Sequence, residues 1–225
     1  MKLALAAALT ILALPLAAEE APGFDQLDIL GARAALLDGR VDDAIAVLKP
    51  AAEAGDPRAQ AFYGSIFDFG DTGEFDAEEA LRWYRLAADQ GYPQALYFIG
   101  NLYRYGTEGF EANPSKSIEW YKRAIALDYG PAFGELGDLL ISGDGVPADE
   151  AAALVYLRRG TDMGDILSSA ALGRAYLAGR GVPKDEAEAR RYLLMGASGG
   201  NMWAQKRGRA GPRTSCWRKT CSGAR

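Results

Sequence analysis

The chain has 225 residues and a formal net charge of −5, from 25 lysines and arginines against 30 aspartates and glutamates. It contains no histidine, which excludes serine–histidine–aspartate and cysteine–histidine nucleophile systems and histidine metal sites. Its two cysteines, Cys216 and Cys221, are too few for a four-thiolate zinc site. The hydrophobic fraction of 49% is typical of a folded protein and not of a disordered one.

Residues 1–18 have the layout of a cleavable signal peptide. Lys2 gives a positive start, residues 3–18 are almost entirely Ala, Leu and Ile, and a polar chain begins at Glu19. The apolar run is short for a membrane span, which takes about 20 residues. We therefore expect cleavage near Ala18 and an exported bacterial protein, periplasmic or secreted, without a stable membrane span. An uncleaved anchor is the alternative.

The charge is divided unevenly along the chain. Residues 19–205 hold 17 basic and 30 acidic side chains, so their net charge is 17 − 30 = −13. Such an acidic body disfavours nucleic acid or anionic lipid as a ligand. Residues 206–225 hold seven basic side chains and no acidic one. They read either as a genuine basic tail or as the product of a shifted reading frame, and we expect them to be poorly ordered.

A repeat organises the body of the chain. Four segments read small-x-x-x-apolar-Gly-x-x-(aromatic or Leu)-x-x-Gly, and their central glycines are spaced 36, 37 and 36 residues apart. These glycines are Gly64, Gly100, Gly137 and Gly173. A repeat of this length indicates stacked supersecondary units. Each unit is predicted to be a first helix (helix A) containing that glycine, a loop that begins with a second glycine, and a second helix (helix B).

A second set of residues supports the same period. Tyrosines recur in the predicted helices B at Tyr84, Tyr121, Tyr156 and Tyr192, and the first two follow tryptophans, Trp83 and Trp120. Glycine inside a helix costs about 1 kcal/mol relative to alanine, so its recurrence suggests a packing reason. We expect helix B to cross helix A closely at each central glycine, with the aromatic pair lying against the gap. The aromatic pairs could also form a stacking platform for sugars or bases, but recurrence at one helical position favours core packing.

Other signals set the element boundaries and the domains. Proline opens three helices A, at Pro57, Pro93 and Pro131, and side chains suited to capping open the helices B. A shorter pair, predicted over Ala32–Leu37 and Asp43–Ala54, precedes the repeats as a cap. The predicted domains are a signal peptide (1–18), a linker with the capping pair (19–55), about four repeats with the start of a fifth (56–205) and the basic tail (206–225).

These residues resemble the Sel-one-like repeat family, a branch of the tetratricopeptide-type helical repeats. The resemblance covers roughly Ala32–Gln205 and is most typical at Gly64–Gly91 and Gly100–Tyr121. It departs from the family pattern at Asp128, where helix B usually ends in glycine, and at Val155 and Arg191, where tryptophan is usual. The resemblance implies an all-α, right-handed superhelical solenoid that binds proteins. Bacterial members often work in the envelope as adaptors or regulators.

The sequence contains no pattern that singles out a catalytic, metal or cofactor site. The glycine pairs at 143–145 and 179–181 recur with the repeat and follow helices, which disfavours a phosphate loop. Carboxylates are frequent, but no catalytic pair stands out among them. We therefore expect a non-enzymatic scaffold without a cofactor. The alternative is a cell-wall or β-lactam hydrolase, because secreted cysteine-rich relatives have been linked to β-lactams. Those relatives carry a disulfide in each repeat, which this chain lacks.

The candidate binding residues come from two variable columns of the predicted helices A. One column follows the central glycine and the other lies three residues further on, so the two share a helical face. Stacked helices A line one face of a solenoid, usually the concave one. The sequence predicts a groove there that binds a partner protein or peptide; the alternative is a solvated face that binds nothing. The candidate residues are Ser65, Asp68, Asn101, Arg104, Asp138 and Arg174.

Overall fold

The computed structural model describes residues 24–197 except 72, 74 and 108. Within these residues all regular elements are helices, ten in number, and none is long and apolar enough to span a membrane. The predicted signal peptide, the start of a fifth repeat and the basic tail lie outside the described residues. The helices are α1 (Gln26–Leu37), α2 (Val41–Glu53), α3 (Pro57–Phe69), α4 (Ala77–Asp89), α5 (Pro93–Tyr105), α6 (Pro114–Ile125), α7 (Gly130–Ser142), α8 (Glu150–Asp162), α9 (Ile166–Ala178) and α10 (Glu186–Ala197).

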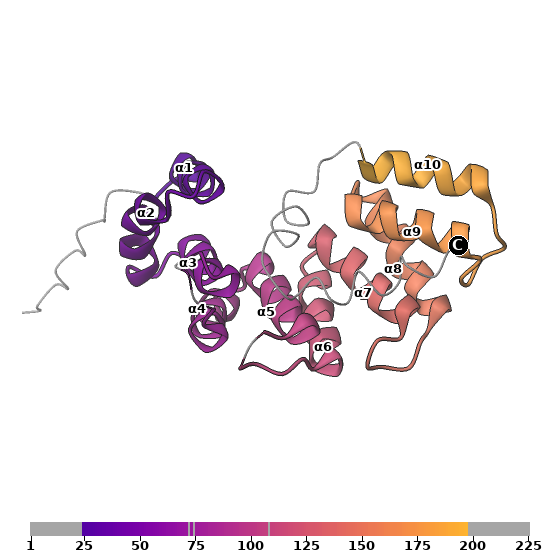
Figure 1. The fold of residues 1–225 in the computed structure, drawn as a ribbon, viewed down its shortest axis with the longest axis horizontal. Helices are drawn as coiled ribbons and strands as arrows, with labels where there is room; N and C mark the ends of the chain where they lie inside the picture. The colour runs from indigo at the N-terminus through magenta and orange to yellow at the C-terminus, as the bar shows by residue number, and fades with distance from the viewer. Residues whose placement is uncertain (1–23, 72, 74, 108, 198–225) are drawn as a thin grey trace, which may run out of the picture.

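The helices are stacked in pairs along an arc (Figure 1). Helix A and helix B of the four repeats are α3 with α4, α5 with α6, α7 with α8, and α9 with α10. The first three helices B also pack on the next helix A. In the first two repeats the helices A lie toward the inside of the arc, with α3 above α4 and α5 above α6 (Figure 1). The predicted all-α solenoid with a repeat of about 36 residues is confirmed.

One backbone hydrogen bond closes the loop between helix A and helix B in every repeat. The amide of the residue that caps helix B donates to the carbonyl of the aromatic or leucine residue near the end of helix A. The four bonds are Asp76 to Phe67, Asn113 to Tyr103, Asp149 to Leu140 and Asp185 to Tyr176, at 2.6–3.2 Å. The capping side chains accept amides of the first helical turn as expected, for example Asp76 from Glu79 at 2.9 Å. The bond thus joins equivalent positions in each repeat, ten residues apart in the second repeat and nine in the other three.

The central glycines allow helix B to cross close to helix A, as predicted. A Cβ atom at Gly64 would lie 3.0 Å from the Tyr84 ring, and one at Gly100 would lie 2.5 Å from the Tyr121 ring. Both tyrosines are fully buried. Any side chain at these glycines would therefore push the two helices apart or displace the tyrosine ring. The surrounding core is closely packed and leaves little space for the ring to move.

The predicted tyrosine column is wrong in the third and fourth repeats. Gly137 is packed against Leu157 and Gly173 against Leu193, not against Tyr156 and Tyr192. The residues that fill the gap are thus Tyr84, Tyr121, Leu157 and Leu193, spaced 37, 36 and 36 residues apart. Tyr156 and Tyr192 therefore occupy the position of Trp83 and Trp120 in the first two repeats. Val155 and Arg191 lie one position earlier, so they are not departures from the family pattern at the tryptophan position. The core selects for a filled volume next to glycine and accepts leucine in place of a tyrosine ring.

The tryptophans lie at the edge of the core, one residue before the gap. Trp83 is buried against Tyr63, and its indole N–H donates to Glu79 at 2.7 Å. Trp120 is half-buried, and the Arg123 guanidinium lies 4.3 Å from its ring centroid. The aromatic pairs are therefore packing residues, as expected, and charged side chains lie against both indoles.

The N-terminal pair α1–α2 packs on α3 as the expected cap, but its first helix is longer than predicted. The helix begins at Gln26 and not at Ala32. Asp25 and Asp28 explain the earlier start, since each carboxylate accepts the backbone amide of the other, at 2.8 and 3.0 Å. Ile29, in the first turn of this helix, is already buried.

Candidate functional site

The six candidate residues lie on α3, α5, α7 and α9, the helices A of the four repeats. Three of them are buried within the stack. The Ser65 hydroxyl donates to the carbonyl of Phe62 in its own helix at 2.7 Å. Asp68 accepts from the Tyr84 hydroxyl at 3.2 Å, and Asn101 accepts from the Tyr121 hydroxyl at 2.6 Å. Asp68 and Asn101 therefore pair helix A with helix B inside one repeat.

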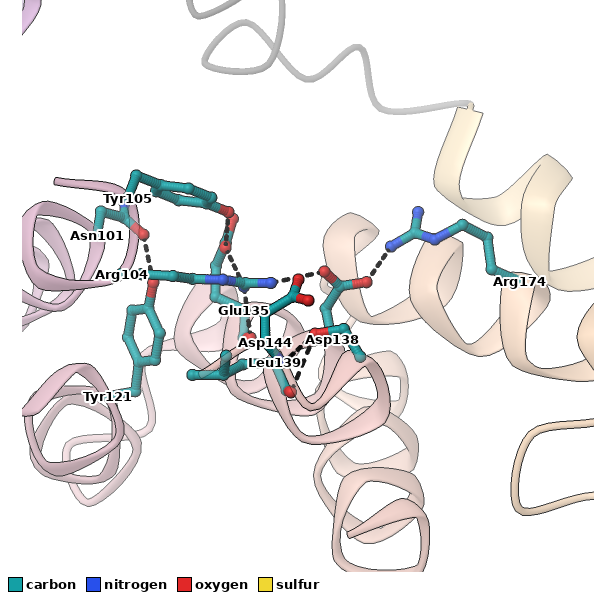
Figure 2. Close-up of polar contacts among 10 residues, drawn as sticks. Asn101, Arg104, Tyr105, Tyr121, Glu135, Asp138, Leu139, Asp144 and Arg174 are labelled. Carbon is teal, nitrogen blue, oxygen red and sulfur yellow. Dashed lines mark hydrogen bonds and ion pairs between the residues drawn. The ribbon is translucent and has the colours of Figure 1, made fainter. Parts of the chain in front are cut away.

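The other three residues form one chain of ion pairs across successive repeats (Figure 2). At its centre is Arg104 of α5, whose side chain is only 7% exposed. Its Nη1 donates to Oε2 and to the carbonyl oxygen of Glu135 in α7, at 2.6 and 2.7 Å. Its Nη2 donates to Asp138 Oδ2 at 2.7 Å. These contacts with both Glu135 and Asp138 fix the guanidinium in one orientation between α5 and α7.

Asp138 joins Arg104 to the next repeat. Its Oδ2 accepts from Arg104, and its Oδ1 accepts from Nη2 of Arg174 in α9 at 2.6 Å. The side chain of Asp138 is 33% exposed and that of Arg174 is 45% exposed. The chain of contacts thus runs from a buried arginine to a solvent-exposed one, and it presents the Arg174 end on the surface of the helices A.

The electrostatics keep this group of side chains charged. Burial alone would raise the pKa of Asp138, but the guanidinium groups of Arg104 and Arg174 outweigh it and hold that pKa below the ordinary value. Burial would lower the pKa of Arg104, but the acidic groups around it, Glu135 and Asp138 included, raise it well above the ordinary value. Both residues therefore stay ionised, and their pairing persists throughout the neutral range.

Sequence reasoning missed two members of the group, Glu135 and Tyr105. The Tyr105 hydroxyl donates to Glu135 Oε2 at 2.7 Å, next to the Arg104 contact. Figure 2 shows both side chains meeting at this carboxylate, between α5 and α7. The missed signal was a pair of opposite charges 31 residues apart, at Arg104 and Glu135, which a repeat of about 36 residues brings onto neighbouring helices. Among the described residues no group of three or more acidic, cysteine or histidine side chains is placed to hold a metal ion.

Comparison with known proteins places this arrangement in a family. The profile described as "Sel1 repeat" matches four segments, residues 57–92, 93–129, 135–165 and 167–201. These segments correspond to the four helix pairs of the structure and together cover more than half of the chain. The sequence matched none of the curated proteins with which it was compared.

Solved structures with the same fold include a Sel1 repeat protein from Oxalobacter formigenes. It is 29% identical with a TM-score of 0.61, and the alignment covers 79% of this chain and 72% of that one. A second is c5321, a protective antigen present in uropathogenic Escherichia coli strains that displays an SLR fold. It is 26% identical with a TM-score of 0.60, and the alignment covers 88% of this chain but only 42% of that one. The present chain thus spans less than half the length of c5321.

A third structure shares the fold alone. The immunity protein PA5088 from Pseudomonas aeruginosa is 23% identical with a TM-score of 0.55, over 80% of this chain and 68% of that one. Proteins built from Sel1 repeats generally mediate protein–protein interactions, and the fold is a scaffold that is typically non-enzymatic. With four matched repeats, ten helices in the described residues and solved relatives of the same architecture, the chain belongs to the Sel1 repeat family.

Proposed function

We propose that this protein is a non-enzymatic scaffold of the bacterial cell envelope that binds a partner protein or peptide on the surface of its helices A. One observation supports the choice of surface. The exposed pair Asp138–Arg174 is held in place by the nearly buried Arg104, so side chains from three repeats present a fixed polar pattern. A surface fixed before binding loses little conformational entropy when a partner docks.

The location in the envelope is supported by the sequence of residues 1–18. Their positive start, apolar run and small residues before Glu19 are typical of an exported protein. Cell fractionation combined with intact-mass measurement tests this part of the proposal. We expect the protein in the periplasm or the medium, with a mass that corresponds to removal of about the first 18 residues. A full-length protein confined to the cytoplasm would contradict it.

Partner capture with matched variants tests the binding surface. Arg174→Asp reverses the exposed charge on α9, whereas Arg158→Asp makes the same change at an exposed position of the helix B α8. We expect proteins captured from periplasmic extract by the unaltered chain to be lost with Arg174→Asp and retained with Arg158→Asp. Loss with Arg158→Asp alone would place the binding surface on the helices B. Circular dichroism of each variant confirms that the fold is intact.

A further inference from the structure

We propose that the surface formed by α7 and α9 binds a segment that carries one carboxylate beside an aliphatic side chain, with Arg174 as the group that receives the carboxylate. The inference rests on the proposed function and names the chemistry of the partner. It depends on three features of this surface: the free donors of Arg174, the pairing of Asp138 with two arginines, and two aliphatic side chains next to them.

Arg174 has donors to spare. Among the contacts of the described residues, its Nη2 bonds Asp138 at 2.6 Å, and neither Nη1 nor Nε makes a hydrogen bond. The side chain is 45% exposed, so these donors can be reached from solvent. A guanidinium carries five N–H donors in a fixed planar fork that matches a carboxylate. Because Asp138 holds this fork in place, a partner carboxylate meets an arginine that is already oriented.

Asp138 is not available to a cationic partner in the same way. Its two oxygens already accept from Arg174 and from Arg104, and Arg104 is fixed in turn by Glu135. An ammonium or guanidinium group that approached Asp138 would meet a carboxylate already paired with two guanidinium groups and would be repelled by both. The exposed end of the network therefore favours an anionic group over a cationic one.

Two aliphatic side chains lie three residues beyond the charged pair. Ile141 follows Asp138 on α7, and Leu177 follows Arg174 on α9, so each shares a helical face with its charged neighbour. Leu177 is 43% exposed and Ile141 is half-buried. The same column holds Asp68 in α3 and the nearly buried Arg104 in α5. The combination of an exposed cation with an aliphatic contact therefore occurs on α7 and α9 and not on α3 and α5.

The charge of the body limits the partner further. Residues 19–205 carry a net charge of 17 − 30 = −13, which repels a strongly acidic segment at long range. The partner must therefore supply its carboxylate locally, within a segment of neutral or positive net charge. This distinguishes the expected partner from a polyacidic tract, which would contact Arg174 only against the field of the whole body.

A peptide selection tests the inference directly. A phage-displayed library of random peptides is selected on the purified protein, on Arg174→Glu and on Arg158→Glu, the latter a control at an exposed position of α8. We expect enriched peptides with one Asp or Glu near an aliphatic residue and without net negative charge. Their affinity should fall about tenfold or more with Arg174→Glu, because a hydrogen bond to a charged group is lost and replaced by repulsion. It should not change with Arg158→Glu.

The outcomes separate this inference from the proposed function. Arg174→Met provides a second test without charge repulsion of Asp138, and it should also weaken the peptides. In one outcome the peptides bind Arg174→Glu and Arg174→Met as tightly as the unaltered protein but do not bind Leu177→Asp. That result would overturn the carboxylate site and leave the proposed binding surface in place. Peptides indifferent to all three changes, or no enrichment, would overturn the inference and count against the proposed surface as well.

Discussion

Gly100 and Tyr121 lie so close together that a Cβ atom on the glycine would come within 2.5 Å of the tyrosine ring. The Tyr121 hydroxyl also donates to Asn101, the residue that follows the glycine, at 2.6 Å. One ring thus both fills the gap between α5 and α6 and bonds the helix that it packs against. This relationship explains why a glycine recurs in the middle of helix A despite its low helix propensity.

The first prediction concerns Gly100→Ala. Alanine favours the helix by about 1 kcal/mol, but overpacking a filled core costs about 1–3 kcal/mol. Because the ring of Tyr121 is fully buried and cannot move aside, we expect a net loss of stability, measured by thermal or urea unfolding. Gly31→Ala in α1 is the matched control, since a Cβ there meets nothing within 4 Å, and it should stabilise the protein. Stabilisation by both changes would refute the packing role of Gly100.

The second prediction concerns Asp128, which follows α6 and has a φ of 53°. The corresponding residues after α2, α4 and α8 are Gly55, Gly91 and Gly164, all with positive φ. A side chain in the left-handed region costs about 1–2 kcal/mol, less for Asp than for most residues. We expect Asp128→Gly to be more stable than the unaltered chain and Asp128→Ala to be less stable.

The ion pair of Asp128 does not reverse this order. Arg159 donates to Asp128 at 2.9 Å, but both side chains are largely exposed, and such pairs contribute about 0–1 kcal/mol. Arg159→Met measures that contribution separately by the same unfolding experiment. An Asp128→Gly variant that is less stable than Arg159→Met would show that Asp128 has a further role.

The third prediction compares the buried and the exposed arginine. Arg104→Met leaves Glu135 without its guanidinium in a nearly buried position, which typically costs about 3–5 kcal/mol. Arg159→Met removes an exposed pair and should cost no more than about 1 kcal/mol. Replacing Arg104 and Glu135 together by Met should recover part of the loss, because no charge is left buried without a partner. Equal effects of the two single changes in urea unfolding would contradict the burial of Arg104.

The fourth prediction concerns pH. The folded pKa of Asp138 lies below its ordinary value of 3.8, so its contribution to stability is fully present above that value and is lost as the pH falls through the folded pKa. Asp138→Asn should therefore destabilise the protein at pH 7, and the difference should close in the acidic range below about pH 4. A constant difference down to the most acidic pH at which the protein stays folded would argue against ionic pairing.

Asp165 should show the opposite dependence. Burial raises its pKa, although it accepts from the amide and the hydroxyl of Ser168 at the start of α9. A raised pKa means that the favourable contribution is present below the unfolded value and is lost as the pH rises through the folded one. Asp165→Asn keeps an acceptor for the amide and should gain stability relative to the unaltered chain as the pH rises above the ordinary pKa of 3.8. Asp165→Ala also loses the cap, at a cost of about 1 kcal/mol.

Much of the fold could be predicted from the sequence because its signals are local. The glycines inside the helices A, the prolines that open them and the caps of the helices B each act within a few residues, and the repeat copies them. The tyrosine column could not be placed by residue type alone. Tyr156 and Tyr192 matched the expected residue, but the gap in those repeats is filled by Leu157 and Leu193, one position later.

The candidate site could be predicted only in part, because the sequence does not show how neighbouring helices pack. The two variable columns led to Arg104, Asp138 and Arg174, but the sequence did not show which of their side chains would be buried. Burial depends on the spacing of neighbouring helices, which is set by three-dimensional packing. Glu135 was missed because it lies outside both columns, on the side of α7 that the long side chain of Arg104 reaches.

The most direct test of the account is site-specific photo-crosslinking in living cells that produce the protein. A photoreactive amino acid replaces Leu177, which is exposed on the helix A α9, or Val155, which is exposed on the helix B α8. The account predicts a specific crosslinked partner from position 177 and none from position 155. A partner captured from position 155 and not from position 177 would contradict binding on the surface of the helices A.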